Sequence, residues 1–208
     1  MSVKVKICGI TNLADAQGAV AAGADLLGFI FHEKSPRCVT LPAAAEIARQ
    51  LPLTVLRVGV FVNAPEKLVF QAVHACGLNL LQFHGDEPPE YCTQFGLMSI
   101  KAFRISNEAS LSALPAYPTD AYLLDACVPG VPGGTGRQFN WDLAVQARQF
   151  GKPIFLAGGL TPENVAAAVL QVQPFAVDVS SGVEQSPGKK DPAKVRAFIA
   201  NVRLASPS

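Results

Sequence analysis

Lys4-Val5-Lys6-Ile7-Cys8-Gly9-Ile10-Thr11 is the stretch from which the fold can be worked out. Apolar residues alternate here with lysines, which is the period of a β-strand, and the glycine interrupts the pattern. Thr11 or Asn12 then caps a helix expected over Leu13–Ala22. Cys8 therefore ends the first strand, where active sites are built if that strand belongs to a parallel barrel. Taken alone, Cys8 is also compatible with a small buried hydrophobic residue.

The composition describes one globular domain. The chain has 208 residues, half of them hydrophobic, and a formal net charge of +1. A domain over residues 1–208 can bury a sizeable core, and the balanced charge favours neither a nucleic acid nor a membrane as partner. No apolar window is long enough for a transmembrane helix, and no signal-peptide pattern is present. Five scattered cysteines predict reduced thiols and a cytoplasmic protein.

Strand-like and helix-like segments alternate along the whole chain. The expected strands are Val3–Cys8, Leu26–Phe31, Val55–Val62, Leu78–Phe83, Ser99–Ala102, Ala121–Asp125, Pro153–Ala157 and Phe175–Val179. The expected helices are Leu13–Ala22, Pro42–Gln50, Pro65–Ala75, Pro89–Gln94, Glu108–Ala113, Trp141–Gln149, Pro162–Leu170 and Pro192–Val202. Eight such pairs favour a single-domain (β/α)8 TIM barrel of the α/β class. An open doubly wound sheet is the alternative.

Polar residues follow several of the expected strands, and in a barrel these loops meet at one mouth. Arg37 lies in the polar loop after strand two and is suited to grip a carboxylate, although a solvated loop is the alternative. Gln82 and His84 share one face of strand four, where His84 can also be structural. Asp125 ends an apolar strand, so it is functional, solvated or a loop anchor. The three histidines lack metal-ligand spacing, so we expect no metal.

Donor-rich loops follow strands seven and eight. The first contains Gly158 and Gly159, and the second contains Ser180, Ser181 and Gly182. Barrels bind phosphate groups between these two loops, through backbone N–H groups that glycine leaves open. The pair of loops therefore predicts a phosphorylated small-molecule ligand.

The motifs in their order resemble the phosphoribosylanthranilate isomerase family of tryptophan biosynthesis. The motifs are KICGIT from Lys6, SPR ending at Arg37, QFHGDE from Gln82, Asp125 with GGTG from Gly133, AGGL from Ala157, and DVSSGVE from Asp178. The resemblance spans nearly the whole chain. Its strand-four motif has Phe83 where a leucine is common in the family, at a position expected to face away from the mouth.

The resemblance implies an Amadori rearrangement of N-(5-phosphoribosyl)anthranilate to 1-(2-carboxyphenylamino)-1-deoxyribulose 5-phosphate, without a cofactor. It implies Cys8 as general base, Asp125 as general acid and Arg37 as the holder of the anthranilate carboxylate. It adds Gly134 and Asp178 to the expected substrate-binding residues.

Two other functions stay open from the sequence. A relative of indole-glycerol-phosphate synthase would need a lysine acid, for which Lys101 is available. A non-catalytic phosphate-ester-binding barrel would not need Cys8 and Asp125 together. The sequence is compatible with either a monomer or a homodimer.

Overall fold

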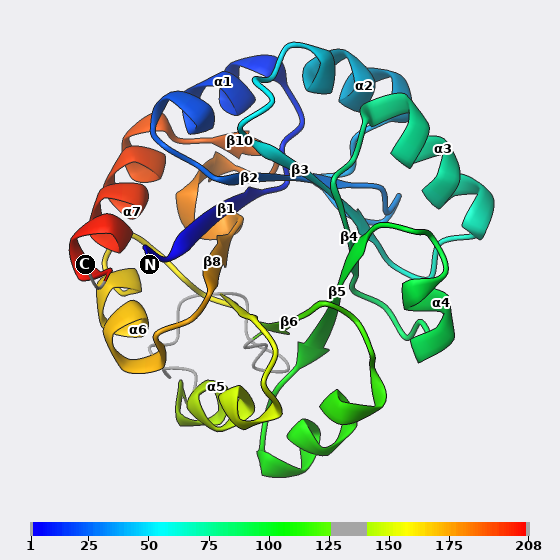
Figure 1. Cartoon of the computed structure of the whole chain (residues 1–208). Helices are drawn as coiled ribbons and strands as arrows, with labels where there is room; N and C mark the ends of the chain where they lie inside the picture. The colour runs from blue at the N-terminus through cyan, green and yellow to red at the C-terminus, as the bar shows by residue number, and fades with distance from the viewer. Residues whose placement is uncertain (1, 126–140, 207–208) are drawn as a thin grey trace.

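Eight parallel strands hydrogen-bond in chain order and close into a barrel (Figure 1). The computed structural model describes residues 2–125 and 141–206. The strands are β1 (Lys4–Cys8), β2 (Leu26–Ile30), β3 (Leu56–Phe61), β4 (Leu80–Phe83), β5 (Met98–Arg104), β6 (Ala121–Asp125), β7 (Ile154–Ala157) and β8 (Ala176–Val179). Closure comes from β1, which pairs with β2 on one side and with β8 on the other. The predicted (β/α)8 barrel is confirmed, and the open sheet is excluded.

Helices surround the barrel as an outer ring (Figure 1). They are α1 (Leu13–Ala21), α2 (Leu41–Arg49), α3 (Glu66–Cys76), α4 (Pro89–Thr93), η1 (Glu108–Ala116), α5 (Trp141–Ala147), η2 (Arg148–Phe150), α6 (Val165–Val172), η3 (Ser181–Val183) and α7 (Pro192–Ala205), where η marks a 3₁₀ helix. A short antiparallel hairpin of β9 (Glu184–Ser186) and β10 (Lys189–Lys190) follows η3. No helix among the described residues is both long and apolar enough to span a bilayer.

Two of the predicted helices differ from the structure for a reason that their contacts show. The fifth is a 3₁₀ helix, η1, in which the Ser112 hydroxyl bonds to the carbonyl of Ala109 at 2.8 Å and competes with regular helix geometry. The seventh begins at Val165 and not at Pro162. The delay follows from the side chain of Asn164, which accepts from the N–H of Thr161 at 2.8 Å and folds that segment as a turn.

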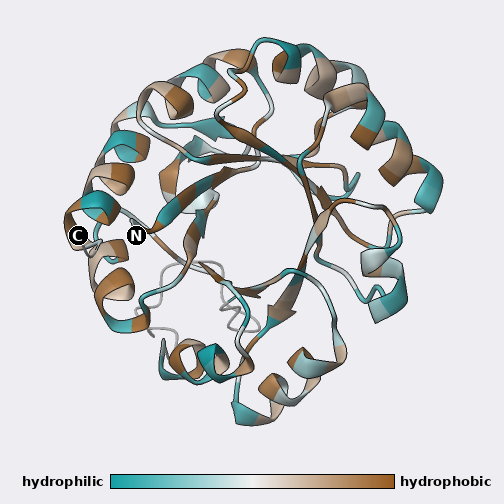
Figure 2. Ribbon diagram, viewed as in Figure 1, coloured by the Kyte–Doolittle hydropathy of each residue, from teal (hydrophilic) through white to brown (hydrophobic). Residues whose placement is uncertain are grey.

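The strands separate two hydrophobic cores. Outward residues such as Val5 and Ile7 pack against the helices. The second core fills the barrel interior and consists of Leu26, Val58, Leu80, Ile100, Ala102, Ala121, Leu123, Phe155, Ala157 and Ala176. Figure 2 accordingly shows the strands mainly in hydrophobic colours and the helices in a mixture of both. The filled interior leaves the carboxyl ends of the strands as the place for a site.

Capping side chains fix the first and last helices. Asn12 accepts from the N–H of Asp15 at 2.9 Å, and Asp191 accepts from Ala193 and Lys194 at 2.8 and 3.1 Å. The C-terminal segment from position 204, which the sequence suggests would fray, is tied down as far as Ser206. The hydroxyl of Ser206 accepts from the N–H of Val3 at 3.2 Å, which brings the two ends of the chain together.

Candidate active site

The predicted site residues meet in one cavity of about 270 Å³ at the carboxyl ends of the strands. The residues that line it include Cys8, Arg37, Gln82, His84, Asp125, Gly158, Gly159, Asp178, Ser180, Ser181 and Gly182. Gly134, the remaining predicted residue, lies outside the described residues. The barrel topology thus gathers six separate loops and strand ends into a single site.

Cys8 lies at the edge of this cavity with its sulfur largely buried. Burial raises the pKa of the Cys8 thiol, and the nearby cations Lys6 and Lys190 act in the opposite direction. Lys6 precedes Cys8 on the same face of β1, is fully buried and pairs with Asp178 at 2.9 Å between Nζ and Oδ1. The thiol therefore lies in a buried but charged environment.

Asp125 belongs to a chain of three polar side chains. The Nε2 amide of Gln82 lies 2.9 Å from Nδ1 of His84, and Nε2 of His84 lies 3.2 Å from Oδ2 of Asp125. With Gln82 as donor, His84 carries its proton on Nε2 and donates it to Asp125. The second oxygen, Oδ1, has no hydrogen-bond partner among residues 2–125 and 141–206. The histidine thereby orients the carboxyl group and leaves one oxygen for a ligand.

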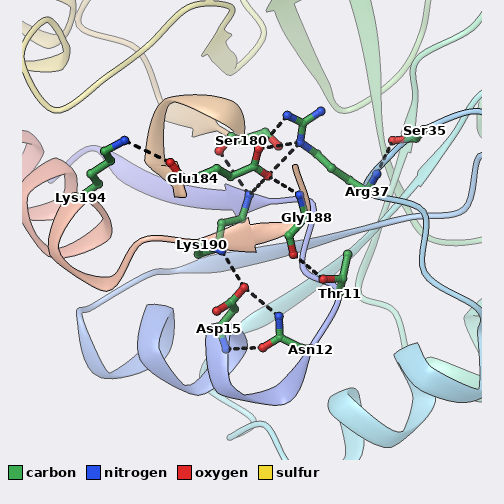
Figure 3. A network of polar contacts seen from close by, with 10 residues as sticks. All are labelled: Thr11, Asn12, Asp15, Ser35, Arg37, Ser180, Glu184, Gly188, Lys190 and Lys194. Atoms are coloured by element: carbon green, nitrogen blue, oxygen red, sulfur yellow. Dashed lines mark hydrogen bonds and ion pairs between the residues drawn. The ribbon is translucent and has the colours of Figure 1, made fainter. Parts of the chain in front are cut away.

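Arg37 is held by an ion pair that sequence reasoning missed. Its Nε lies 2.9 Å from Oε1 of Glu184 and its Nη2 lies 2.7 Å from Oε2 (Figure 3). The hydrogen bonds that Arg37 donates to Glu184 raise the pKa of its guanidinium. One edge of the guanidinium is thus used internally, and Nη1 has no partner within the described part of the chain. The edge formed by Nη1 and Nη2 remains for a carboxylate ligand.

Lys190 completes this network from the β9–β10 hairpin. Its Nζ, in a side chain that is almost fully buried, lies 2.9 Å from Oε1 of Glu184 and 3.2 Å from the carbonyl oxygen of Ser180 (Figure 3). Burial alone raises the pKa of the Glu184 carboxyl, but hydrogen bonds from Arg37 and Lys190 outweigh it and hold that pKa below its usual value. The hairpin therefore connects the arginine to the loop after β8.

Close backbone approach shapes the loops around the cavity. Gly158 and Gly159 have φ values of 84° and 65°, in the left-handed region that favours glycine. A Cβ atom at Gly182 would overlap the carbonyl oxygen of Leu160, so the loops after β7 and β8 pack directly on each other. The hydroxyl of Ser180 is buried and lacks a hydrogen-bond partner among the described residues. Such open amides and an unpaired hydroxyl suit a phosphate group.

Three charged residues of the site were not predicted from the sequence. They are Lys6, Glu184 and Lys190. Glu184 ends a motif that is recognisable in the sequence, but its partner Arg37 lies 147 positions away. Lys6 alternates with apolar residues and so reads as the solvent face of a strand, whereas it is buried in the barrel. The spacing could have indicated this, because residues two positions apart on a strand point to the same face, so Lys6 shares the face of Cys8.

Comparison with known proteins gives the family. The family model described as N-(5′-phosphoribosyl)anthranilate isomerase matches residues 5–201. A protein of that name from Pelobacter propionicus is 54% identical over 197 residues, which cover 95% of this chain and 94% of the relative. The chain belongs to the N-(5′-phosphoribosyl)anthranilate isomerase family. The predicted membership of this family of tryptophan biosynthesis, and with it the predicted isomerase class, is confirmed.

Solved structures of the family share the barrel. The phosphoribosyl anthranilate isomerase of Thermotoga maritima has a TM-score of 0.92 and 44% identity, covering 97% of this chain and 99% of its own. That enzyme is described as dimeric. A further family structure, with a TM-score of 0.88 and 42% identity, contains reduced 1-(o-carboxyphenylamino)-1-deoxyribulose 5-phosphate and covers the same shares of the two chains.

Proposed function

We propose that this protein catalyses the Amadori rearrangement of N-(5′-phosphoribosyl)anthranilate to 1-(2-carboxyphenylamino)-1-deoxyribulose 5-phosphate. The observation that carries the proposal is the shared cavity of Cys8 and Asp125, which come from β1 and β6. A carboxyl group and a thiol on one cavity supply an acid and a base to a single bound sugar. The family and its complex with a reduced product support the choice of substrate.

The acid and the base act in sequence. Asp125 protonates the furanose ring oxygen, the bond from that oxygen to C1′ breaks, and the anilino nitrogen lone pair forms an iminium. The Cys8 thiolate then takes the proton from C2′ and gives an enolamine, which tautomerises to the ketone. The product is an isomer of the substrate, so only protons are moved and no redox partner is needed.

The two ends of the substrate carry charges that the cavity can bind. The free edge of the Arg37 guanidinium holds the anthranilate carboxylate, since Glu184 fixes the other edge. The loops at Gly158–Gly159 and Ser180–Gly182 hold the phosphate. Gln82, His84 and Asp178 bind or orient the sugar between them, and Gly134 remains a proposed contact on sequence grounds.

The two alternative functions fit the site less well. Lys101, which a relative of indole-glycerol-phosphate synthase would use as acid, does not line the cavity of Cys8 and Asp125. Its Nζ is buried and engaged by Glu87 at 2.9 Å. A phosphate-binding barrel without activity would have no need of an acid and a base on the same cavity.

A coupled assay separates all three functions. Anthranilate and phosphoribosyl pyrophosphate, with the transferase that joins them, generate the substrate in place, and chromatography then identifies the product. The ketose phosphate supports the proposal. An indole product supports the first alternative, and unchanged substrate with retained phosphate binding supports the second.

The phosphate subsite gives a prediction of its own. Inorganic phosphate should inhibit competitively and weakly, and Gly159→Asn should raise its inhibition constant about tenfold or more, a change of about 1.4 kcal/mol. Asparagine tolerates left-handed backbone, and at Gly159 a side chain would enter open space. Steady-state inhibition measures the effect.

Gly151→Asn is the matched control for this change. Gly151 has φ 72° and equally open surroundings, and it lies outside the candidate cavity. Its variant should keep the inhibition of the original protein. Unchanged phosphate inhibition in Gly159→Asn would count against the subsite.

We further propose that the assembly is a homodimer formed through the amino-terminal ends of the strands. Leu56, Met98 and Phe175 line an apolar cavity of about 220 Å³ there, although each is at least 38% exposed. Leu53, on the loop before β3, is 89% exposed and fits such a cavity in a second copy. An exposed apolar cavity beside an exposed apolar side chain favours self-association.

Leu53→Asp should convert the dimer to a monomer with unchanged turnover, because a carboxylate is costly to bury in an apolar cavity. Light scattering coupled to gel filtration measures the mass. Leu170→Asp, at a 65% exposed leucine on α6, is the control and should remain dimeric. A monomeric unmodified protein would contradict the proposal.

We also propose a cytoplasmic location. The cysteines that the structure describes, Cys8, Cys38, Cys76 and Cys92, are free thiols. A thiol that serves as a base must remain reduced, which the cytoplasm provides.

A further inference from the structure

Lys6 is a buried charge for which the reaction scheme above has no role. The side chain is fully buried on the inner face of β1, one step below Cys8. Burying an ammonium group is costly unless it is paired. Asp178 on β8 provides the partner at 2.9 Å. The pair compensates the buried charge of the ammonium at the floor of the cavity.

Gly28 on β2 makes room for the lysine and the cysteine together. A Cβ atom at this position would lie 2.7 Å from Sγ of Cys8 and 3.1 Å from Nζ of Lys6. Both atoms therefore converge on the space that the missing side chain leaves open. Gly28 pairs with Cys8 across the sheet, so the arrangement is built into the register of β1 and β2.

The charged side chains around Cys8 carry one net positive charge. Lys6, Lys190 and Arg37 carry three positive charges, and Asp178 and Glu184 carry two negative ones. Lys6, Asp178 and Lys190 act directly on the Cys8 thiol, and Cys8 acts on Arg37. The other ionisable groups of the cavity, His84 and Asp125, contact each other. A thiolate at Cys8 would bring the five-charge cluster to neutrality.

We propose that Lys6 is a positioning residue that holds a positive charge against the sulfur of Cys8 and so stabilises the thiolate that removes the substrate proton. The inference rests on the proposed role of Cys8 as the base. Asp178 compensates the buried charge of the ammonium, and Gly28 allows the ammonium to approach the sulfur. Lys6 does not contact the substrate, because the cavity is lined by Cys8 and Asp178 above it and not by Lys6.

Alkylation of Cys8 by iodoacetamide tests the proposal without using activity, because only the thiolate reacts. Mass spectrometry of the Cys8 peptide follows the rate between pH 7 and 10. In Lys6→Met the reaction at pH 8 should be about tenfold slower or more, the equivalent of one pKa unit. Lys4→Met removes an equal charge from the same strand at the Asp25 ion pair and should leave the rate unchanged.

Turnover supplies a second readout. Activity of Lys6→Met should fall most at neutral pH and recover towards that of the unmodified protein as the pH rises, because added base restores the thiolate. A purely structural role predicts a loss that is independent of pH. A folded Lys6→Met with unchanged Cys8 alkylation would overturn the proposal.

Asp178→Asn provides a test that does not depend on the folding of Lys6→Met. With its carboxylate partner gone, the ammonium keeps the sulfur as its partner among the described residues, and one anion that repels the thiolate is removed. Cys8 should then alkylate faster. Slower or unchanged alkylation would mean that Lys6 pairs with Asp178 without stabilising the Cys8 thiolate, and would overturn the proposal. A failure of the coupled assay in the unmodified protein would reject the proposed function and leave these rates interpretable.

Discussion

Cys8→Ser is expected to lower turnover by about 10²–10⁴-fold, the usual contribution of a general base. A serine hydroxyl is a much weaker base than a thiolate, and the cations beside Cys8 cannot make up this difference. The change is nearly isosteric, so the barrel should fold. Turnover with the natural substrate, together with circular dichroism, measures both effects.

Cys76→Ser is the matched control. Cys76 is a buried cysteine on α3, outside the candidate cavity, so its variant should keep normal turnover.

Asp125→Asn should match Cys8→Ser in severity, because an amide cannot supply the carboxyl proton. The double variant should be little worse than the worse single one, since the two groups act on one path. A folded Cys8→Ser with near-normal turnover would show that the cysteine is only core packing.

Arg37→Ala should weaken use of the natural substrate by about 2–5 kcal/mol, or roughly 30-fold to several-thousand-fold in kcat/KM. The physical reason is the loss of a charge-assisted contact to the anthranilate carboxylate. Part of the cost is internal, because Glu184 is buried and loses one of its two cationic partners. Steady-state kinetics with the natural substrate measures the total effect.

An analogue that lacks the carboxylate separates the two parts. Original protein and Arg37→Ala should use the analogue with similar efficiency, apart from the internal cost at Glu184. Arg37→Lys, which keeps the charge but not the planar fork, should fall between them on the natural substrate. An equal loss on both substrates would rule out Arg37 as the carboxylate-binding residue.

The barrel could be predicted from the sequence because each of its elements has a local sequence pattern. Each strand carries its own apolar run, and several helices begin at a capping side chain, so the order of elements can be read without knowing which strands touch. The site residues were equally accessible, since in this fold they follow the strands. Position at or after a strand end made Cys8, Asp125 and the loops at Gly159 and Ser181 candidates, and the family resemblance supplied the roles proposed for them.

What escaped prediction depends on contacts between distant positions. Lys6 and Asp178 are 172 positions apart, and only closure of the barrel makes them partners. The alternating pattern of β1 showed two faces but not that the one with the lysine turns inward. Arg37 was predicted to grip a ligand carboxylate, and its internal ion pair with Glu184 was missed for the same reason, because Glu184 lies on a hairpin that no local pattern joins to it. The 3₁₀ form of η1 depends on competing serine hydroxyls, which blur a helical pattern.

The contact between the two ends of the chain bears on how the molecule can be rearranged. Val3 donates to Ser206, and Arg203 reaches Asp25 at 2.7 Å, so the last helix lies against the first strand and the turn that follows α1. A short peptide linker could join these ends without disturbing the sheet. New ends could then be opened at the segment around Leu53, which is remote from the cavity but belongs to the proposed dimer contact. The closed ring of strands therefore does not require β1 to come first in the chain. Circularly permuted genes would vary the order in which the strands leave the ribosome.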